Sequence, residues 1–134
     1  MRRMIVLFAA ALVVATACGG TPESTEQPTL SVELTDFAVK ADPGTVKAGH
    51  IVFAVRNRAS MIHDLVVIKT DLAPNALPMD GGKAKEEGKV GSVANLSAGI
   101  SRKLVLELPA GHYVLICNVV GHYQLGMRAA LTVE

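Results

Sequence analysis

Four side chains that can bind a soft metal ion are spaced along this sequence in a suggestive way. Cys117, His122 and Met127 follow one another at five-residue intervals within the stretch CNVVGHYQLGM, and His63 lies well upstream. Thiolate, imidazole and thioether groups are the ligands that soft first-row metal ions select in proteins. The stretch therefore predicts part of a metal site, for which His63 is the candidate fourth ligand.

Each of these residues also has an ordinary explanation when it is taken alone. A single histidine at the start of a strand usually lies on the surface, and a single methionine usually fills a gap in the core. A lone cysteine is usually a small buried apolar residue. The four residues together, placed on matched strands and loops, favour a metal site over these separate explanations.

The residues that follow position 29 indicate β-strands. Leu30, Val32 and Leu34 alternate with polar neighbours, which is the pattern of a half-buried strand. Pro109-Ala110-Gly111 reads as a turn that joins two strands into a hairpin, with Leu104, Leu106 and Leu108 on one face of the first strand. Further strands are predicted over residues 50–57, 63–70, 101–108, 113–117 and 127–133.

The alternation stops between Asp71 and Val93, where prolines, glycines and a cluster of charges predominate. This segment is predicted to be a loop excursion with one helical turn near Lys83 to Glu87. Several short strands separated by turn signals, with almost no helix, are typical of an antiparallel β-sandwich. The expected fold class is therefore all-β.

The predicted strands bring the four candidate ligands to one end of such a sandwich. Cys117 ends one strand, Met127 begins the next, and His122 lies on the loop between them, while His63 starts a neighbouring strand. Two imidazoles, a thiolate and a distant thioether make the trigonal site with a weak axial sulfur that blue-copper electron carriers use. The sequence thus predicts one type 1 copper ion per chain.

The segment from Gly91 to Glu134 resembles the cupredoxin family, in particular its plastocyanin, azurin and auracyanin branch. The residues that carry the resemblance are PAGHYVLICNVVGHYQLGM together with His63. The resemblance implies an eight-stranded Greek-key β-sandwich, one mononuclear copper ion and a role as a small redox shuttle. Gly121 and Gly126 fit a ligand loop that must bend tightly.

Two positions depart from the family pattern. The family often has asparagine after the first ligand histidine, where it braces the cysteine loop, and this chain has Asp64 there. His112 stands where the family usually has a small or polar residue. His112 and His50 are predicted to be structural or surface residues, and the spare thioethers of Met61 and Met79 are predicted to be packing or loop residues.

The N-terminus has the features of an export signal. Arg2 and Arg3 precede an apolar run that ends at Ala17, and Cys18 follows small residues as in a bacterial lipobox. Residues 1–17 are predicted to be a signal peptide, residues 18–29 a lipidated cysteine (Cys18) with a flexible tether, and residues 30–134 the cupredoxin domain. Cleavage without lipidation would instead leave a free protein.

Export has consequences for charge and for the thiols. Removal of residues 1–17 removes two of the 13 basic side chains and leaves 11 basic against 12 acidic ones. This balance lacks the excess of positive charge that nucleic-acid binding needs. In an oxidising compartment paired cysteines form disulfides, and lipidation of Cys18 would leave Cys117 free for a metal. The predicted location is extracytoplasmic or periplasmic, anchored to the membrane at Cys18.

The predicted function is electron transfer between redox proteins, such as a cytochrome or a respiratory or photosynthetic complex, by a monomer. A copper chaperone or copper storage protein is the alternative. A structural zinc site fits less well, because methionine is a poor zinc ligand. The chain is not predicted to be an enzyme, because multicopper enzymes need further histidines and only His50 and His112 remain.

Overall fold

The computed structural model describes residues 26–134, and all regular elements among them are β-strands. No helix in this part of the chain is long and apolar enough to span a bilayer. The strands are β1 (Leu30–Thr35), β2 (Ala38–Asp42), β3 (Thr45–Val46), β4 (Gly49–Asn57), β5 (His63–Lys69), β6 (Met79–Asp80), β7 (Lys83–Ala84), β8 (Lys89–Leu96), β9 (Ser101–Leu108), β10 (Gly111–Ile116) and β11 (Arg128–Val133).

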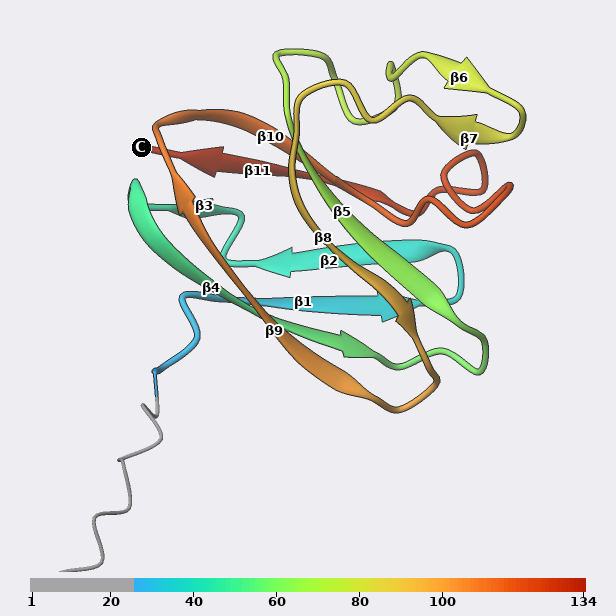
Figure 1. The fold of residues 1–134 in the computed structure, drawn as a ribbon, viewed down its shortest axis with the longest axis horizontal. Helices are drawn as coiled ribbons and strands as arrows, with labels where there is room; N and C mark the ends of the chain where they lie inside the picture. The colour runs from blue at the N-terminus through green and yellow to red at the C-terminus, as the bar shows by residue number, and fades with distance from the viewer. Residues whose placement is uncertain (1–25) are drawn as a thin grey trace, which may run out of the picture.

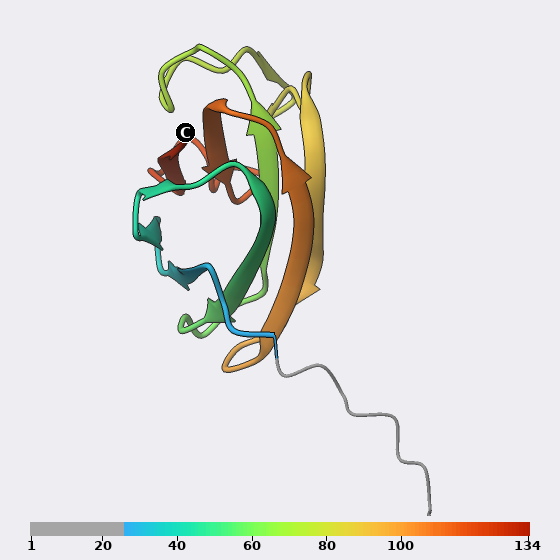
Figure 2. The same ribbon diagram turned by 90° about the vertical axis from the view of Figure 1, so that its left-hand side faces the viewer.

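Two sheets face each other across one core (Figures 1 and 2). The first has the strand order β2-β1-β4-β9 and the second the order β3-β11-β10-β5-β8. Most pairs are antiparallel, but β1 pairs with β4, and β3 with β11, in parallel. The predicted all-β Greek-key sandwich is confirmed, with nine strands in the two sheets where the resemblance implied eight.

The core lies between the sheets and follows the predicted alternation. Leu30, Val32 and Leu34 of β1 are at most 2% exposed, and Phe53 of β4 is fully buried opposite Leu30 in the strand register. Burying one such side chain stabilises the fold by about 1.5–3 kcal/mol. The inward faces of β4, β5 and β10 add Ile51, Val55, Leu65, Val67 and Leu115 to the same cluster.

The prediction that residues 101–117 form a hairpin is wrong, because the two strands do not pair with each other. β9 pairs with β4 in the first sheet, whereas β10 pairs with β11 and β5 in the second. The turn at Pro109 to Gly111 therefore carries the chain from one sheet to the other, and the Tyr113 hydroxyl donates to the Pro109 carbonyl at 2.8 Å. Alternation fixes which face of a strand is buried but not which strand it pairs with.

The segment from Asp71 to Val93 also differs from its prediction. The helical turn expected near Lys83 to Glu87 is absent, and a β6–β7 hairpin stands in its place. Gly81 and Gly82 both have positive φ (55° and 82°), as a two-residue turn of type I′ requires. β8 begins at Lys89, inside the predicted loop; its apolar residues are mostly exposed or half-buried, so it shows no clear alternation.

Smaller differences concern strand ends. β2 and β3, which flank Pro43 and Gly44, were not expected as strands. The last strand starts at Arg128, one residue after Met127, and β10 ends at Ile116, one residue before Cys117. Cys117 and Met127 therefore lie just outside the strands that were predicted to include them.

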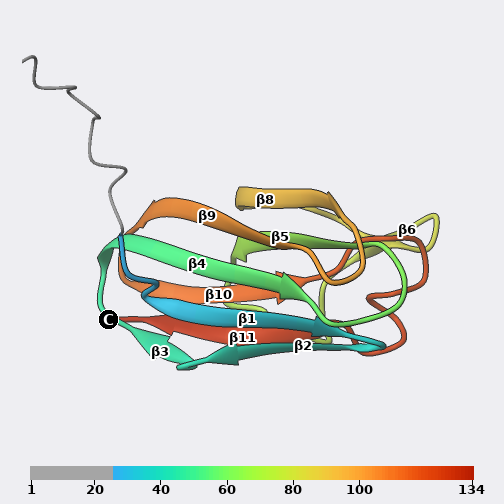
Figure 3. The same cartoon turned by 90° about the horizontal axis from the view of Figure 1, so that it is seen from below.

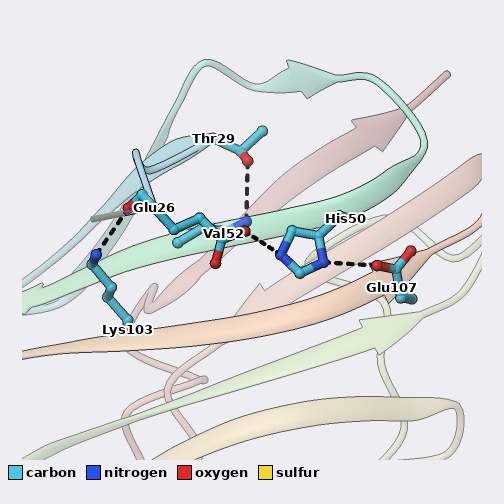
Figure 4. Close-up of polar contacts among 6 residues, drawn as sticks. All are labelled: Glu26, Thr29, His50, Val52, Lys103 and Glu107. Carbon is cyan, nitrogen blue, oxygen red and sulfur yellow. Dashed lines mark hydrogen bonds and ion pairs between the residues drawn. The ribbon is translucent and has the colours of Figure 1, made fainter. Parts of the chain in front are cut away.

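The domain has two distinct ends (Figure 3). The β4–β5 and β10–β11 connections lie at one end, and the beginning of β1 and the end of β11 lie at the other. There, the Val52 amide donates to the Thr29 hydroxyl and Lys103 donates its ammonium to the Glu26 carbonyl, while His50 lies between Glu26 and Glu107 (Figure 4). The predicted signal peptide (1–17), Cys18 and residues 19–25 lie outside the described residues.

Candidate metal centre

His63 is presented by a short turn that one buried asparagine holds in shape. Asn57, at the end of β4, donates its side-chain amide to the carbonyls of Met61 (2.7 Å) and Leu96 (2.8 Å). Its Oδ1 accepts from the amide of Ala59 at 2.9 Å. Since an unsatisfied buried polar group costs about 1–3 kcal/mol, these bonds strongly favour the observed turn. His63 follows as the first residue of β5 and is fully buried.

Cys117 is held by backbone contacts on both sides. Its amide donates to the Met127 carbonyl at 3.0 Å, which extends the pairing of β10 and β11 by one step. Its sulfur accepts a hydrogen bond from the amide of Asp64 at 3.3 Å. The thiol is fully buried and forms no disulfide within residues 26–134. The sulfur is therefore fixed to β5 through the residue that follows His63.

His122 lies on a loop of tight turns between Cys117 and Met127. Its amide donates to the Val119 carbonyl (2.9 Å), and its carbonyl accepts from the Met127 amide (3.1 Å). Gly121 has φ of 84° and Gly126 has φ of 115°, a conformation that favours glycine. The predicted tight bends at these two glycines are present. The His122 side chain is half-buried.

Three donor atoms from these segments meet at one point. His63 Nδ1 and His122 Nδ1 are 3.1 Å apart, and Cys117 Sγ is 3.6 Å from each. A point equidistant from all three lies about 2.0 Å from each, close to the distance at which imidazole nitrogen binds a first-row metal ion. In the part of the chain that the structure describes, no other group of three His, Cys, Asp or Glu donors converges in this way.

Burial shifts the pKa of two of the donors, His63 and Cys117, in the metal-free protein. Desolvation, with a smaller contribution from His122, lowers the pKa of His63, so this imidazole is neutral and its Nδ1 can bind a metal. Desolvation raises the pKa of Cys117 despite the hydrogen bond from Asp64, so the thiol holds its proton until a metal displaces it. His63 Nε2 is buried with no partner among the described residues.

The fourth predicted ligand, Met127, is fully buried and packs in the same core cluster as Cys117. Its backbone contacts both Cys117 and His122, which places the residue beside the three donors. Met61 is instead exposed in the β4–β5 loop, and Met79 is half-buried on β6. His50 and His112 are exposed near the opposite end, at the starts of β4 and β10.

The departure at position 64 has a structural answer. The Asp64 amide bonds the Cys117 sulfur, but its carboxylate accepts from the Asn95 amide at 2.8 Å, on β8. The side chain therefore supports β8 instead of the cysteine loop. Asn57, Asn118 and Tyr123 are buried residues around the site that the sequence did not single out. In the sequence, these residues differ from others only in being polar or aromatic and next to a predicted ligand or strand end.

Solved structures of blue copper proteins have the same fold. Auracyanin from Roseiflexus castenholzii matches with 22% identity over 78% of this chain and 94% of that chain, at a TM-score of 0.59. Auracyanin A from Chloroflexus aurantiacus, a "blue" copper protein, has 21% identity, coverage of 78% and 98%, and a TM-score of 0.54. Rusticyanin from Thiobacillus ferrooxidans has 14% identity, coverage of 81% and 79%, and a TM-score of 0.59. No curated protein sequence matches the chain.

A Greek-key sandwich with two imidazoles and one thiolate gathered at one end defines a cupredoxin, a class whose cofactor is type 1 copper. Within that class, the sequence model of the sulfocyanin (SoxE) domain matches residues 45–134, and the chain belongs to the sulfocyanin family. The match includes all four predicted ligands. The donor set fits copper, which takes both imidazole and soft sulfur.

Proposed function

We propose that this chain carries single electrons with one type 1 copper ion held by His63, Cys117, His122 and Met127. The observation that carries the proposal is the convergence of two Nδ1 atoms and one sulfur from three separate segments. When bound, the copper ion would supply the redox change between Cu(II) and Cu(I). The protein residues would hold nearly the same positions in both states.

Rigidity of the donors supports this role. Cu(II) favours nitrogen and a tetragonal field, whereas Cu(I) favours sulfur and low coordination, so a fixed mixed set suits neither state fully. The sulfur of Cys117 is held by the Asp64 amide, and the turn before His63 is held by Asn57. A site that moves little on reduction has a low reorganisation barrier. Buried ligands also argue against the alternative of a copper chaperone or storage protein, which must exchange its metal.

The exposed surface around His122 suggests where electrons would enter and leave. Val120 is 63% exposed and Leu125 is 60% exposed on the same loop, and Ile62 is 50% exposed on the β4–β5 loop. We call these three residues the apolar rim. Transient redox interfaces are small, and an apolar centre desolvates quickly without binding for long. The half-buried His122 ring would be the electron port, and a redox protein would dock on the rim.

Export and anchoring at Cys18 complete the proposal. The described domain begins at the end opposite the ligands, where Glu26 contacts β9 through Lys103. An anchor at Cys18 would thus leave the copper end free to meet a partner outside the cytoplasmic membrane. Metabolic labelling with a radioactive fatty acid tests this: wild type should be labelled and Cys18→Ala should not, and an unlabelled wild type would remove the anchor.

The metal site itself is tested with residues 19–134 and Cu(II). A thiolate bound to Cu(II) gives an intense visible charge-transfer band, which ascorbate should bleach. Cys117→Ser should remove the band, whereas His112→Gln, a change at an exposed histidine outside the site, should leave it unchanged. Colourless binding of Cu(II) by the wild type would contradict a blue-copper site.

A further inference from the structure

Residues 71–88 form an excursion that leaves the second sheet after β5 and returns at β8. Its β6–β7 hairpin lies beside the β10–β11 connection, which carries His122 (Figures 1 and 3). We call residues 71–88 the excursion and residues 118–126 the ligand loop. The two segments are far apart in sequence, yet they contact each other at three places along the ligand loop.

The first contact precedes His122 directly. The Gly121 amide donates to the Gly82 carbonyl at 2.9 Å. The hairpin approaches the loop so closely here that a Cβ atom on Gly82 would lie 3.1 Å from Cγ1 of Val120. The position of the His122 backbone is therefore tied to the tip of the β6–β7 hairpin.

The second contact follows Cys117 directly. The side chain of Asn118 accepts from the Ala84 amide (2.9 Å) and donates to the Ala84 carbonyl (2.9 Å), so it pairs with β7 as a neighbouring strand would. It also donates to the Glu86 carboxylate at 2.8 Å. Asn118 is 4% exposed, so its two bonds to Ala84 are shielded from water, and the bond to Glu86 is partly shielded. Lost bonds here would leave buried polar groups unsatisfied.

The third contact is made by Tyr123, the residue after His122. Its hydroxyl donates to the Pro74 carbonyl (2.7 Å) and accepts from the Leu77 amide (3.0 Å). Its ring is 3% exposed and belongs to a second apolar cluster on the outer face of the second sheet. That cluster includes Leu77 and Ala84 of the excursion and is separate from the main core.

We infer that the excursion is a brace that fixes the ligand loop from outside the sandwich, with Asn118 and Tyr123 as positioning residues. Apart from the excursion, the ligand loop is held by its own turns, by the Cys117–Met127 pairing and by the Arg128 guanidinium, which donates to the Tyr123 carbonyl at 2.7 Å. The carboxylate of Asp64 bonds β8 and therefore does not support the ligand loop. The brace concerns the loop itself, and its effect on electron transfer rests on the proposed function.

The experiment compares two tyrosine-to-phenylalanine changes of equal chemistry. Tyr123→Phe removes the hydroxyl that bonds the excursion, and Tyr113→Phe removes a hydroxyl that bonds Pro109 at the other end of the domain. Amide hydrogen exchange of the metal-free protein is measured residue by residue. Tyr123→Phe should speed exchange at Gly121, His122 and Met127 by about fivefold or more, and Tyr113→Phe should not.

A milder pair keeps the test decisive if Tyr123→Phe does not fold. Glu86→Ala removes the carboxylate that Asn118 contacts, and Glu87→Ala changes the exposed neighbour. Only Glu86→Ala should speed exchange in the ligand loop, by about twofold to fivefold. Equal effects of the two members of a pair, or no effect of Tyr123→Phe or Glu86→Ala, would overturn the brace.

Copper then reports the consequence for the site. Loaded with Cu(II), Tyr123→Phe should shift the visible band and slow electron self-exchange, while Tyr113→Phe should match wild type in both. If the brace is present by hydrogen exchange but wild type gives no coloured copper site, the proposed function fails and the brace stands. If copper binds with colour and loop exchange is unchanged in both pairs, the brace fails alone.

Discussion

The amide of Asp64 points at the sulfur of Cys117, with nitrogen and sulfur 3.3 Å apart, while the carboxylate of Asp64 accepts from the Asn95 amide at 2.8 Å. One residue therefore links the strand that begins with His63 to the thiol and to β8. The backbone bond does not depend on the side chain at position 64. The negative charge of the Asp64 side chain has a separate effect. It raises the pKa of Cys117, but less than burial does.

Asp64→Asn should raise the reduction potential and keep the visible band. Asparagine retains the Oδ1 acceptor for Asn95 and the amide to Cys117, but it removes a negative charge that favours the more positive Cu(II) state. The expected rise is on the order of tens of millivolts by voltammetry. Glu107→Gln, which removes a carboxylate near the opposite end, is the control and should leave the potential unchanged. A lower potential in Asp64→Asn would contradict this reasoning.

Met127→Leu should raise the reduction potential and Met127→Gln should lower it, because the axial ligand of such a site tunes the potential. Leucine removes a weak donor to copper and so destabilises the oxidised state, whereas the glutamine oxygen donates more strongly. The visible band should largely persist in the leucine variant. Voltammetry of both variants checks the prediction, and an unchanged potential in each would mean that Met127 does not bind the metal.

Val120→Lys should slow electron self-exchange without changing the visible spectrum. The side chain is 63% exposed in the apolar rim, so a charge there would hinder docking and repel a second copy without touching the ligands. Val105→Lys is the matched control, because Val105 is 44% exposed on β9, in the first sheet, away from the ligand loop. Equal rates in the two variants would place the electron port elsewhere.

Gly126→Ala should destabilise the domain by about 1–3 kcal/mol, because a side chain is strained at its φ of 115° and a Cβ would lie 3.1 Å from the Phe37 carbonyl oxygen. Gly44→Ala is the control, since a Cβ there meets nothing within 4 Å and no positive φ opposes it. Urea unfolding of the metal-free variants measures both. Similar midpoints for the two would show that the loop relaxes around alanine at position 126.

The contact of His50 with Glu107 and Glu26 should make stability depend on pH. The His50 ring donates hydrogen bonds to the carboxylates of Glu107 and Glu26, and these bonds, that to Glu107 first, raise the pKa of His50 in the folded state. Lys103, a charged neighbour of Glu26, bonds the Glu26 carbonyl and neither carboxylate among the described residues. The contribution should be complete below about pH 6.5, the ordinary histidine pKa, and should be lost as the pH rises through the raised folded value.

The measurement for His50 is an NMR titration of its ring together with unfolding midpoints at about pH 5.5 and about pH 8.5. His50→Gln should remove the part of the pH dependence that belongs to this contact. The difference between the two proteins isolates His50 from the two histidines of the metal site. A His50 pKa at or below the ordinary value would contradict the prediction.

The sequence predicted the parts of the structure that local patterns encode. Alternation identified β1, β4 and β5, and donor chemistry with even spacing identified the residues that the structure brings together at one end. Alternation could not show that β9 and β10 lie in different sheets, because both burial patterns are the same in a hairpin and in a crossover. β8 was missed because its apolar residues are mostly exposed or half-buried and leave no alternating pattern.

The polar supports of the site were beyond the reach of local patterns for a different reason. Asn118 bonds Ala84 and Glu86, and Tyr123 bonds Pro74 and Leu77, across 32 to 49 residues of sequence. Whether such a side chain is buried and paired depends on where a distant segment lies. Only the folded arrangement of the excursion and the ligand loop shows it.

Both ends of the described chain lie at the end of the sandwich opposite His63 and His122. Glu26, the first described residue, contacts His50 at the start of β4, and Glu134 donates its amide to the Val46 carbonyl just before that strand. A carrier protein fused to either terminus, or an electrode linked through one, would therefore hold the domain with its ligands turned outward. The same placement makes the domain a module that could be joined in tandem with every ligand end still exposed to solvent.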